Sequence, residues 1–156
     1  MENREVIVKE AYSKMAQLCS RSEQCSVDIR RKMITYDLVN EVVEEIIEKL
    51  KEEKFIDDER FVKAYVSDKF RLNKWGKIKM QHYLKMKGLS DKLIQLGMDS
   101  IDDEKYKLVL IKTMKDKAKT IRNKNKFEKM GQIIRFTQSR GFEAELIHRY
   151  MNEVLE

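Results

Sequence analysis

Few side chains in this sequence have the spacing that catalysis or metal binding requires. The two histidines, His82 and His148, have no Ser, Cys or second His placed as in a catalytic triad or a metal site. The two cysteines, Cys19 and Cys25, have no further Cys or His at ligand spacing, which favours ordinary reduced thiols. No glycine-rich phosphate loop occurs. The sequence therefore predicts no enzyme, no metal site and no cofactor.

Two acidic pairs could be metal ligands or helix starts. They lie in matching hexamers 45 residues apart, Ile56–Phe61 and Ile101–Tyr106. The first aspartate of each, Asp57 or Asp102, precedes an apolar helical pattern and can accept the free backbone N–H groups of a first turn. The flanking apolar residues have the spacing of a hydrophobic staple. Helix capping is the favoured interpretation, and the duplication indicates an internal repeat.

The segment from residue 69 to residue 79 favours a binding role. It holds five Lys or Arg in eleven residues, the only Trp and no acidic residue. Basic side chains beside an aromatic ring commonly hold phosphates while the ring packs on a base or sugar. Trp75 is either that ring or a core residue at a turn, and the sequence leaves both open. The candidate contacts are Lys69, Arg71, Lys74, Trp75, Lys77 and Lys79.

Further basic residues recur at matching places in the repeat. Lys85 and Lys87 correspond to Arg135 and Arg140, and residues 30–32 form a smaller cluster earlier in the chain. If the repeats stack in register, these side chains line a shared groove. A basic run over residues 115–126 is either a solvated helix end or a further contact.

Net charge narrows the class of partner. The chain carries +6 overall; residues 1–54 carry −2, whereas residues 55–100 and residues 101–156 carry +4 each. A basic surface attracts nucleic acid through counterion release, or an acidic protein through complementary potential. With a charged start and no apolar stretch of spanning length, we expect a cytoplasmic protein without a membrane partner.

The pattern of apolar residues predicts an all-α fold. There is no proline to interrupt helices, and no alternation typical of strands. Asp37, Gly88 and Gly141 each suit the left-handed residue that ends a helix, and Gly97 is expected at a helix end as well. The predicted fold is an elongated, curved array of three three-helix units: 6–54 (helices near 7–20, 26–36 and 40–54), 57–100 (57–72, 75–87 and 90–99) and 102–155 (102–121, 125–139 and 143–155).

Taken in order, these features resemble the RecX family of recombination regulators. The resemblance rests on the tandem units, the helix start at Asp57–Phe61, the Gly76–Met80 turn, and the closing turns Lys87–Leu89 and Arg140–Phe142. It covers residues 9 to 155, and the central unit carries most of it. It implies a non-enzymatic bacterial protein that binds the RecA recombinase filament and restrains its recombinase, ATPase and co-protease activities in DNA repair and the SOS response.

The leading hypothesis is therefore a monomeric negative modulator of RecA, which contacts the filament and its single- or double-stranded DNA, directly or through RecA. The alternative is a stand-alone DNA-binding protein made of helix-turn-helix-like units. Two departures from the repeat, Asp37 in place of a glycine and Thr137 in place of a core leucine, leave the fold intact. They and the acidic first unit put equal use of all three units in doubt, and shift the expected contacts to the second and third.

Overall fold

The computed structural model describes residues 2–156, and this part of the chain is all-α, as predicted, with no strand. Proline is absent, so loops rather than proline kinks change the direction of the chain. The elements are α1 (Glu2–Arg21), α2 (Ser26–Lys32), the 3₁₀ helix η1 (Met33–Tyr36), α3 (Asn40–Glu52), α4 (Asp58–Asn73), α5 (Lys77–Lys87), α6 (Asp91–Asp99), α7 (Asp103–Thr120), α8 (Lys126–Ser139) and α9 (Ala144–Leu155).

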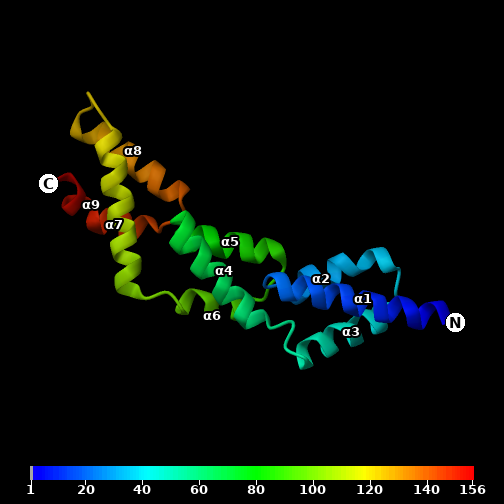
Figure 1. Ribbon diagram of the computed structural model, residues 1–156. Coiled ribbons are helices and arrows are strands. Elements are labelled where there is room, and N and C mark those ends of the chain that lie inside the picture. The colour runs from blue at the N-terminus through cyan, green and yellow to red at the C-terminus, as the bar shows by residue number, and fades with distance from the viewer. Residues whose placement is uncertain (1) are drawn as a thin grey trace.

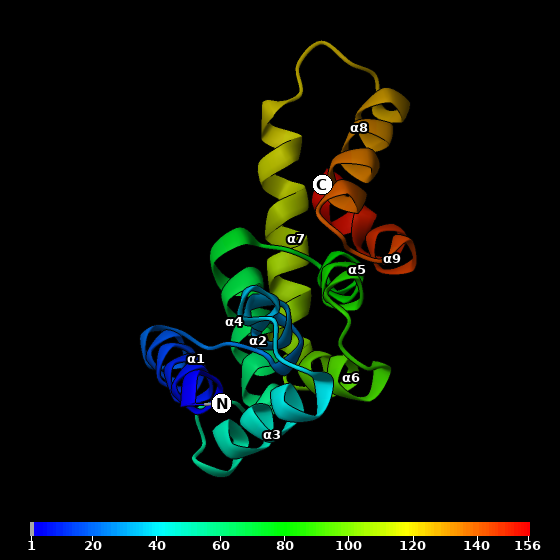
Figure 2. The same ribbon diagram turned by 90° about the vertical axis from the view of Figure 1, so that its right-hand side faces the viewer.

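The helices pack chiefly within consecutive groups of three. The most extensive contacts join α4 to α6, α7 to α9 and α7 to α8, followed by α5 to α6 and α8 to α9, and then by α1 and α2 to α3. Figure 1 shows the groups following one another along an elongated, bent row, in which α7 runs across the row rather than along it. Figure 2 looks along that row from the end at α1–α3. We use the names unit one, unit two and unit three for residues 6–54, 57–100 and 102–155, the division proposed from the sequence.

The duplicated aspartates begin helices, as the sequence predicts. The carboxylate of Asp57 accepts the backbone N–H of Arg60 at 3.0 Å, and that of Asp102 accepts the N–H of Lys105 at 2.9 Å. The predicted staple at the first start is wrong. Ile56 lies in the core of unit one, whereas Phe61 lies in the core of unit two, because the chain crosses between units at this point.

Three of the predicted helix ends adopt the left-handed conformation. The φ angle is 51° at Asp37, 101° at Gly88 and 96° at Gly141. Gly97 lies in the last turn of α6, two residues before its end, and its φ angle is not positive. It lacks a side chain for a different reason: a Cβ there would lie 2.3 Å from Cγ1 of Val62, so the glycine permits close packing of α6 on α4.

Among residues 2–156, the buried apolar side chains form two clusters. One lies between the helices of unit one, around Ile29, Met33, Ile47 and Leu50. The other is continuous through units two and three, and it includes Phe142, whose ring lies 5.3 Å from that of Tyr106 between centroids. Units two and three are therefore held together by a common core. Unit one reaches that core mainly through Cys25 and Val27.

The middle helices of units one and two are capped by the unit that follows each of them. Neither α2 nor α5 has a side-chain cap of its own. Asp58 of α4 accepts the backbone N–H of Ser26 at 2.7 Å and its hydroxyl at 2.5 Å, and so closes the start of α2. The start of α5 donates instead to the Tyr106 hydroxyl and the Gly141 carbonyl, both in unit three. These bonds satisfy N–H groups that a helix start leaves free.

Candidate partner and nucleic-acid interface

The joint between units two and three places two basic segments side by side. The N–H of Gly76 donates to the carbonyl of Arg140 at 2.7 Å, and that of Ile78 donates to the carbonyl of Gly141 at 2.9 Å. A Cβ at Gly76 would lie 2.4 Å from the carbonyl carbon of Gly141, so only glycine allows this approach. The C-terminal end of α8 consequently lies against the N-terminal end of α5 (Figures 1 and 2).

On the α5 side of the joint, two lysines lie over one indole ring. The Nζ atoms of Lys69 and Lys79 are 5.0 Å and 4.7 Å from the centroid of Trp75. The indole ring also stacks on Tyr83, at 5.2 Å between centroids with an interplanar angle of 27°. Trp75 is half-buried and packs against the common core, so it both supports the turn and positions the lysines. We call Lys69, Trp75, Lys79 and Tyr83 the tryptophan group.

On the α8 side, a second aromatic ring carries two cations. Nζ of Lys117 and the guanidinium carbon of Arg140 each lie 5.0 Å from the centroid of Phe136. We call these three residues the phenylalanine group. The two groups are neighbours, because Lys79 Nζ donates to the carbonyl of Ser139 at 3.5 Å, and Ser139 directly precedes Arg140. The two groups form one basic surface across the joint, which we call the junction surface.

The four cations of the junction surface, Lys69, Lys79, Lys117 and Arg140, form no ion pair in the part of the chain that the structure describes. A cation over an aromatic face is stabilised by about 0.5–1 kcal/mol at an exposed site, which orders the side chain without cancelling its charge. The arrangement can hold phosphates or carboxylates and offers ring edges beside them.

The other predicted contacts of residues 69–79 lie away from the junction surface. Arg71 and Lys74 are exposed at the end of α4, where Arg71 pairs with Asp68 at 3.5 Å and Lys74 donates to the carbonyl of Arg71 at 2.8 Å. Lys77 lies over the Tyr106 ring at 4.8 Å from its centroid. The segment therefore does not present its cations to one side, although the sequence grouped them.

Of the residues predicted at matching places in the repeat, Lys87 is engaged inside the molecule. Its Nζ is 2.6 Å from Oδ2 of Asp28 and also lies over the Phe61 ring, so it joins unit two to unit one. Its location argues against a free contact there. Lys85 and Arg135 are exposed on α5 and α8.

Three residues of the junction surface were not among the predicted contacts. Tyr83 lies on the same face of α5 as Lys79, at a spacing of four residues, and Phe136 has the same spacing to Arg140 on α8. This helical spacing was the available signal. Lys117 belongs to the basic run of residues 115–126, for which the sequence left a solvated helix end as the other interpretation.

Behind the joint, a buried tyrosine connects three elements. The Tyr106 hydroxyl donates to a carboxylate oxygen of Glu143 and accepts the N–H of Lys77 at 2.9 Å. Burial raises the pKa of Tyr106 well above its ordinary value of 10.0, and the hydrogen bond to Glu143 raises it further. The Tyr106 phenol is therefore neutral at physiological pH, and it links α5, α7 and the start of α9.

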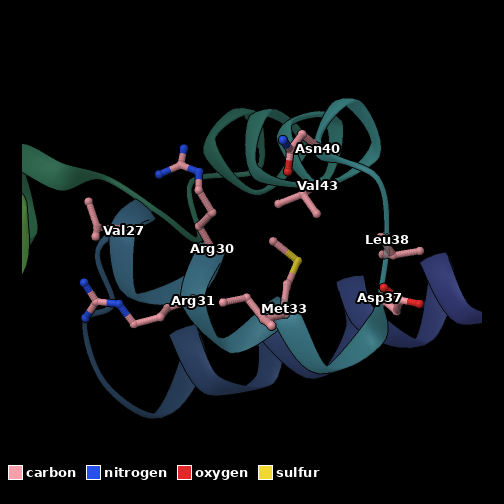
Figure 3. Close-up of a pocket in the computed structure, with 9 residues that line it drawn as sticks. Val27, Arg30, Arg31, Met33, Asp37, Leu38, Asn40 and Val43 are labelled. Carbon is pink, nitrogen blue, oxygen red and sulfur yellow. The ribbon is translucent and has the colours of Figure 1, made fainter.

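Unit one offers a different hollow, of about 440 Å³, between α2, η1 and the start of α3. Figure 3 shows Met33 and Val43 facing each other inside it, with the guanidinium groups of Arg30 and Arg31 at one edge. Arg30 is bound to Glu44 by three hydrogen bonds of 2.9–3.3 Å. The predicted basic cluster of residues 30–32 is therefore partly neutralised by its own unit.

The described residues offer neither a metal site nor a membrane-spanning helix. Within residues 2–156, no group of three or more His, Cys, Asp or Glu side chains is placed to hold a metal ion. In the same range, no helix combines the length and the apolar character needed to cross a membrane.

The sequence is similar to that of known proteins named RecX. A family model described as the second three-helix domain of RecX matches residues 57–98. The regulatory protein RecX of Clostridium tetani is 31% identical over 126 residues, which cover 80% of this chain and 57% of that protein. The protein of the same name from Clostridium acetobutylicum is 26% identical over 150 residues, 92% of this chain and 68% of the relative. The chain thus spans a little over half the length of the first of these relatives.

Solved structures agree on the architecture. A crystal structure of RecX from Lactobacillus salivarius superposes with a TM-score of 0.88 at 18% identity, covering 95% of this chain and 96% of that one. A second crystal structure of a regulatory protein RecX gives 0.82 at 21% identity, covering 94% and 72%. The molecule is an all-α protein of tandem three-helix repeats. Its central unit matches the RecX family model, and the two relatives compared above are both named regulatory protein RecX.

Proposed function

We propose that this chain binds the RecA recombinase filament and restrains its recombinase, ATPase and co-protease activities, without catalysis of its own. The observation that supports this most directly is the junction surface, whose four cations form no ion pair with any residue from 2 to 156. A filament of protein on DNA offers acidic side chains and phosphates along a groove, and an elongated, bent molecule can lie along such a groove. The protein would act as a monomer in the cytoplasm.

The first test is the single-stranded-DNA-dependent ATPase activity of the cognate RecA with this protein titrated in. We expect inhibition at amounts at or below one molecule per recombinase subunit. The variant Lys79→Gln, combined with Lys69→Gln, should require more protein for the same inhibition because two cations of the junction surface are removed. No inhibition at stoichiometric amounts would overturn the proposal.

A matched control exists on α7. Lys112 is exposed and pairs with Asp116 at 2.9 Å, and neither residue belongs to the junction surface. Combined with Arg149→Gln, which breaks an exposed pair with Glu145 on α9, Lys112→Gln removes the same net charge as the double lysine variant. If both double variants inhibit equally poorly, net charge rather than the junction surface determines the effect.

The alternative is a protein that binds DNA by itself, and one observation favours it: the indole ring of Trp75 is flanked by two lysines, an arrangement suited to a base and its phosphates. Trp75 is the only tryptophan, so its fluorescence reports directly on this place. Quenching by an oligothymidylate in the absence of recombinase, with affinity falling steeply with salt, would support the alternative. Unchanged fluorescence at low salt would remove it.

A further inference from the structure

An apolar groove separates the end of α4 from the start of α7. Its volume is about 500 Å³, within the usual range for sites that bind small molecules or a few side chains of a partner. The floor is apolar, and Leu108 at its edge keeps 58% of its surface exposed although it lies on the same helix as the buried Tyr106 and Leu110. The apolar lining residues are Val66, Phe70, Ile101, Leu108 and Val109.

The rim of the groove is positively charged. Arg71, Lys74 and Lys105 line it, against the single carboxylate of Asp102. That carboxylate is held at the start of α7, where it accepts the N–H of Lys105 at 2.9 Å. Asp68 lies nearby as the partner of Arg71 at 3.5 Å, in a pair with both side chains more than half exposed. Such a pair contributes little, so Arg71 can exchange it for another carboxylate.

We propose that this groove binds a protein segment in which an apolar side chain is flanked by carboxylates. The apolar side chain would cover Leu108 and Val109, and the carboxylates would contact Lys74, Lys105 and Arg71. This is a second interaction surface, separate from the junction surface. The proposal does not rest on the RecA contact.

The distribution of charge favours a peptide over a nucleic acid. A nucleic acid carries a phosphate at every step, and the carboxylates of Asp68 and Asp102 would repel some of them. A peptide can place its few carboxylates against the cations alone. The floor is also mostly aliphatic, whereas the rings suited to stacking on bases, Trp75 and Tyr83, belong to the tryptophan group.

The test uses the full chain and a set of short fluorescein-labelled peptides with Leu, Ile or Phe between pairs of aspartates. We expect micromolar binding by fluorescence anisotropy, with amide shifts in ¹⁵N NMR spectra centred on Phe70, Lys105 and Leu108. Matched peptides with Ser at the centre, or with Asn in place of Asp, should bind roughly tenfold more weakly or not at all. If no peptide of the set binds, the proposal is overturned.

Variants locate the binding. Leu108→Asp should weaken it by roughly tenfold or more, since it introduces a like charge beside the peptide. Met86→Asp on α5 is the matched control, because Met86 is 66% exposed and lies outside the groove. Equal loss in the two variants would overturn the assignment. So would displacement of the peptide by an oligothymidylate whose own binding is abolished by Leu108→Asp, because the groove would then be a nucleic-acid site. The assay contains no recombinase, so its failure is distinct from failure of the proposed function.

Discussion

Gly76 donates its backbone N–H to the carbonyl of Arg140 over 2.7 Å, so unit three is fixed against the first turn of α5 by main-chain atoms. A main-chain contact of this kind does not depend on side-chain rotamers. It keeps the two basic groups of the junction surface in one orientation, and it explains why both residues of the closest approach, Gly76 and Gly141, lack side chains.

The first prediction concerns this joint. Gly76→Ala should lower the free energy of unfolding by about 1–3 kcal/mol, because the new Cβ would lie 2.4 Å from the backbone of Gly141 and force the units apart. Urea denaturation measures the change. Gly131→Ala is the control: it lies within α8 and its Cβ would approach only the mobile end of Arg135, at 3.3 Å. That variant should gain about 0.5–1 kcal/mol. A similar loss in both would contradict the model of the joint.

The second prediction concerns the contact between units one and two. Asp58→Ala removes both acceptors for Ser26 and should lower the free energy of unfolding by about 1–2 kcal/mol, the usual loss for a helix cap. Hydrogen exchange should show reduced protection across α2, although the substitution lies on α4. Asp68→Ala on α4, which removes only an exposed pair, should leave α2 unchanged. Unaltered protection of α2 in Asp58→Ala would refute the capping role.

The third prediction follows from the raised pKa of Tyr106. The folded state holds the phenolic proton more tightly than the unfolded state, so this stabilisation is complete below the ordinary pKa of 10.0 and is lost as the pH rises above it. Up to about 1.4 kcal/mol should be lost per pH unit in this range. Comparison with Tyr106→Phe between about pH 8 and about pH 11 isolates the group, since the variant cannot titrate there. If the free energies of unfolding of the two chains fall in parallel with pH, the predicted contribution of Tyr106 is contradicted.

The fourth prediction concerns the thiols. Cys25 has no exposed surface, and burial raises its pKa to about 11, so little thiolate exists at neutral pH. In the variant Cys19→Ser, reaction with a disulfide reagent should be slow in the native state and fast in denaturant. The variant Cys25→Ser leaves Cys19, which is only half-buried, and should react faster in the native state. Equal native rates would show that the region around Cys25 opens readily.

The elements could be predicted because their signals are local. Asp57 and Asp102 cap the helices that follow them. Gly88 and Gly141 end helices in the left-handed conformation, which glycine adopts more readily than other residues. The joints could not be predicted, because they bring together residues far apart in the chain. Nothing near Gly76 indicates that its neighbour is Gly141, and nothing near Lys87 indicates Asp28 as its partner.

Only the part of the candidate site that lies within one segment of the chain could be predicted. A segment rich in lysine identified Lys69, Trp75 and Lys79, which lie together. It also included Arg71, Lys74 and Lys77, because spacing along the chain does not show how the turn at Trp75 separates the side chains. Phe136 and Tyr83 were missed because a ring that carries cations has the same helical spacing as a ring in a core.

The capping of α2 and α5 by the unit that follows each of them has a consequence for synthesis on the ribosome. Unit one leaves the exit tunnel before unit two, and the start of α2 lacks its acceptors until Asp58 has emerged. The start of α5 likewise lacks Tyr106 and Gly141 until unit three is made, so units one and two are each completed by the unit that follows. A nascent chain stalled between two units would expose a loosened middle helix to proteases and chaperones. The units are therefore expected to complete their folding in the order in which they are synthesised.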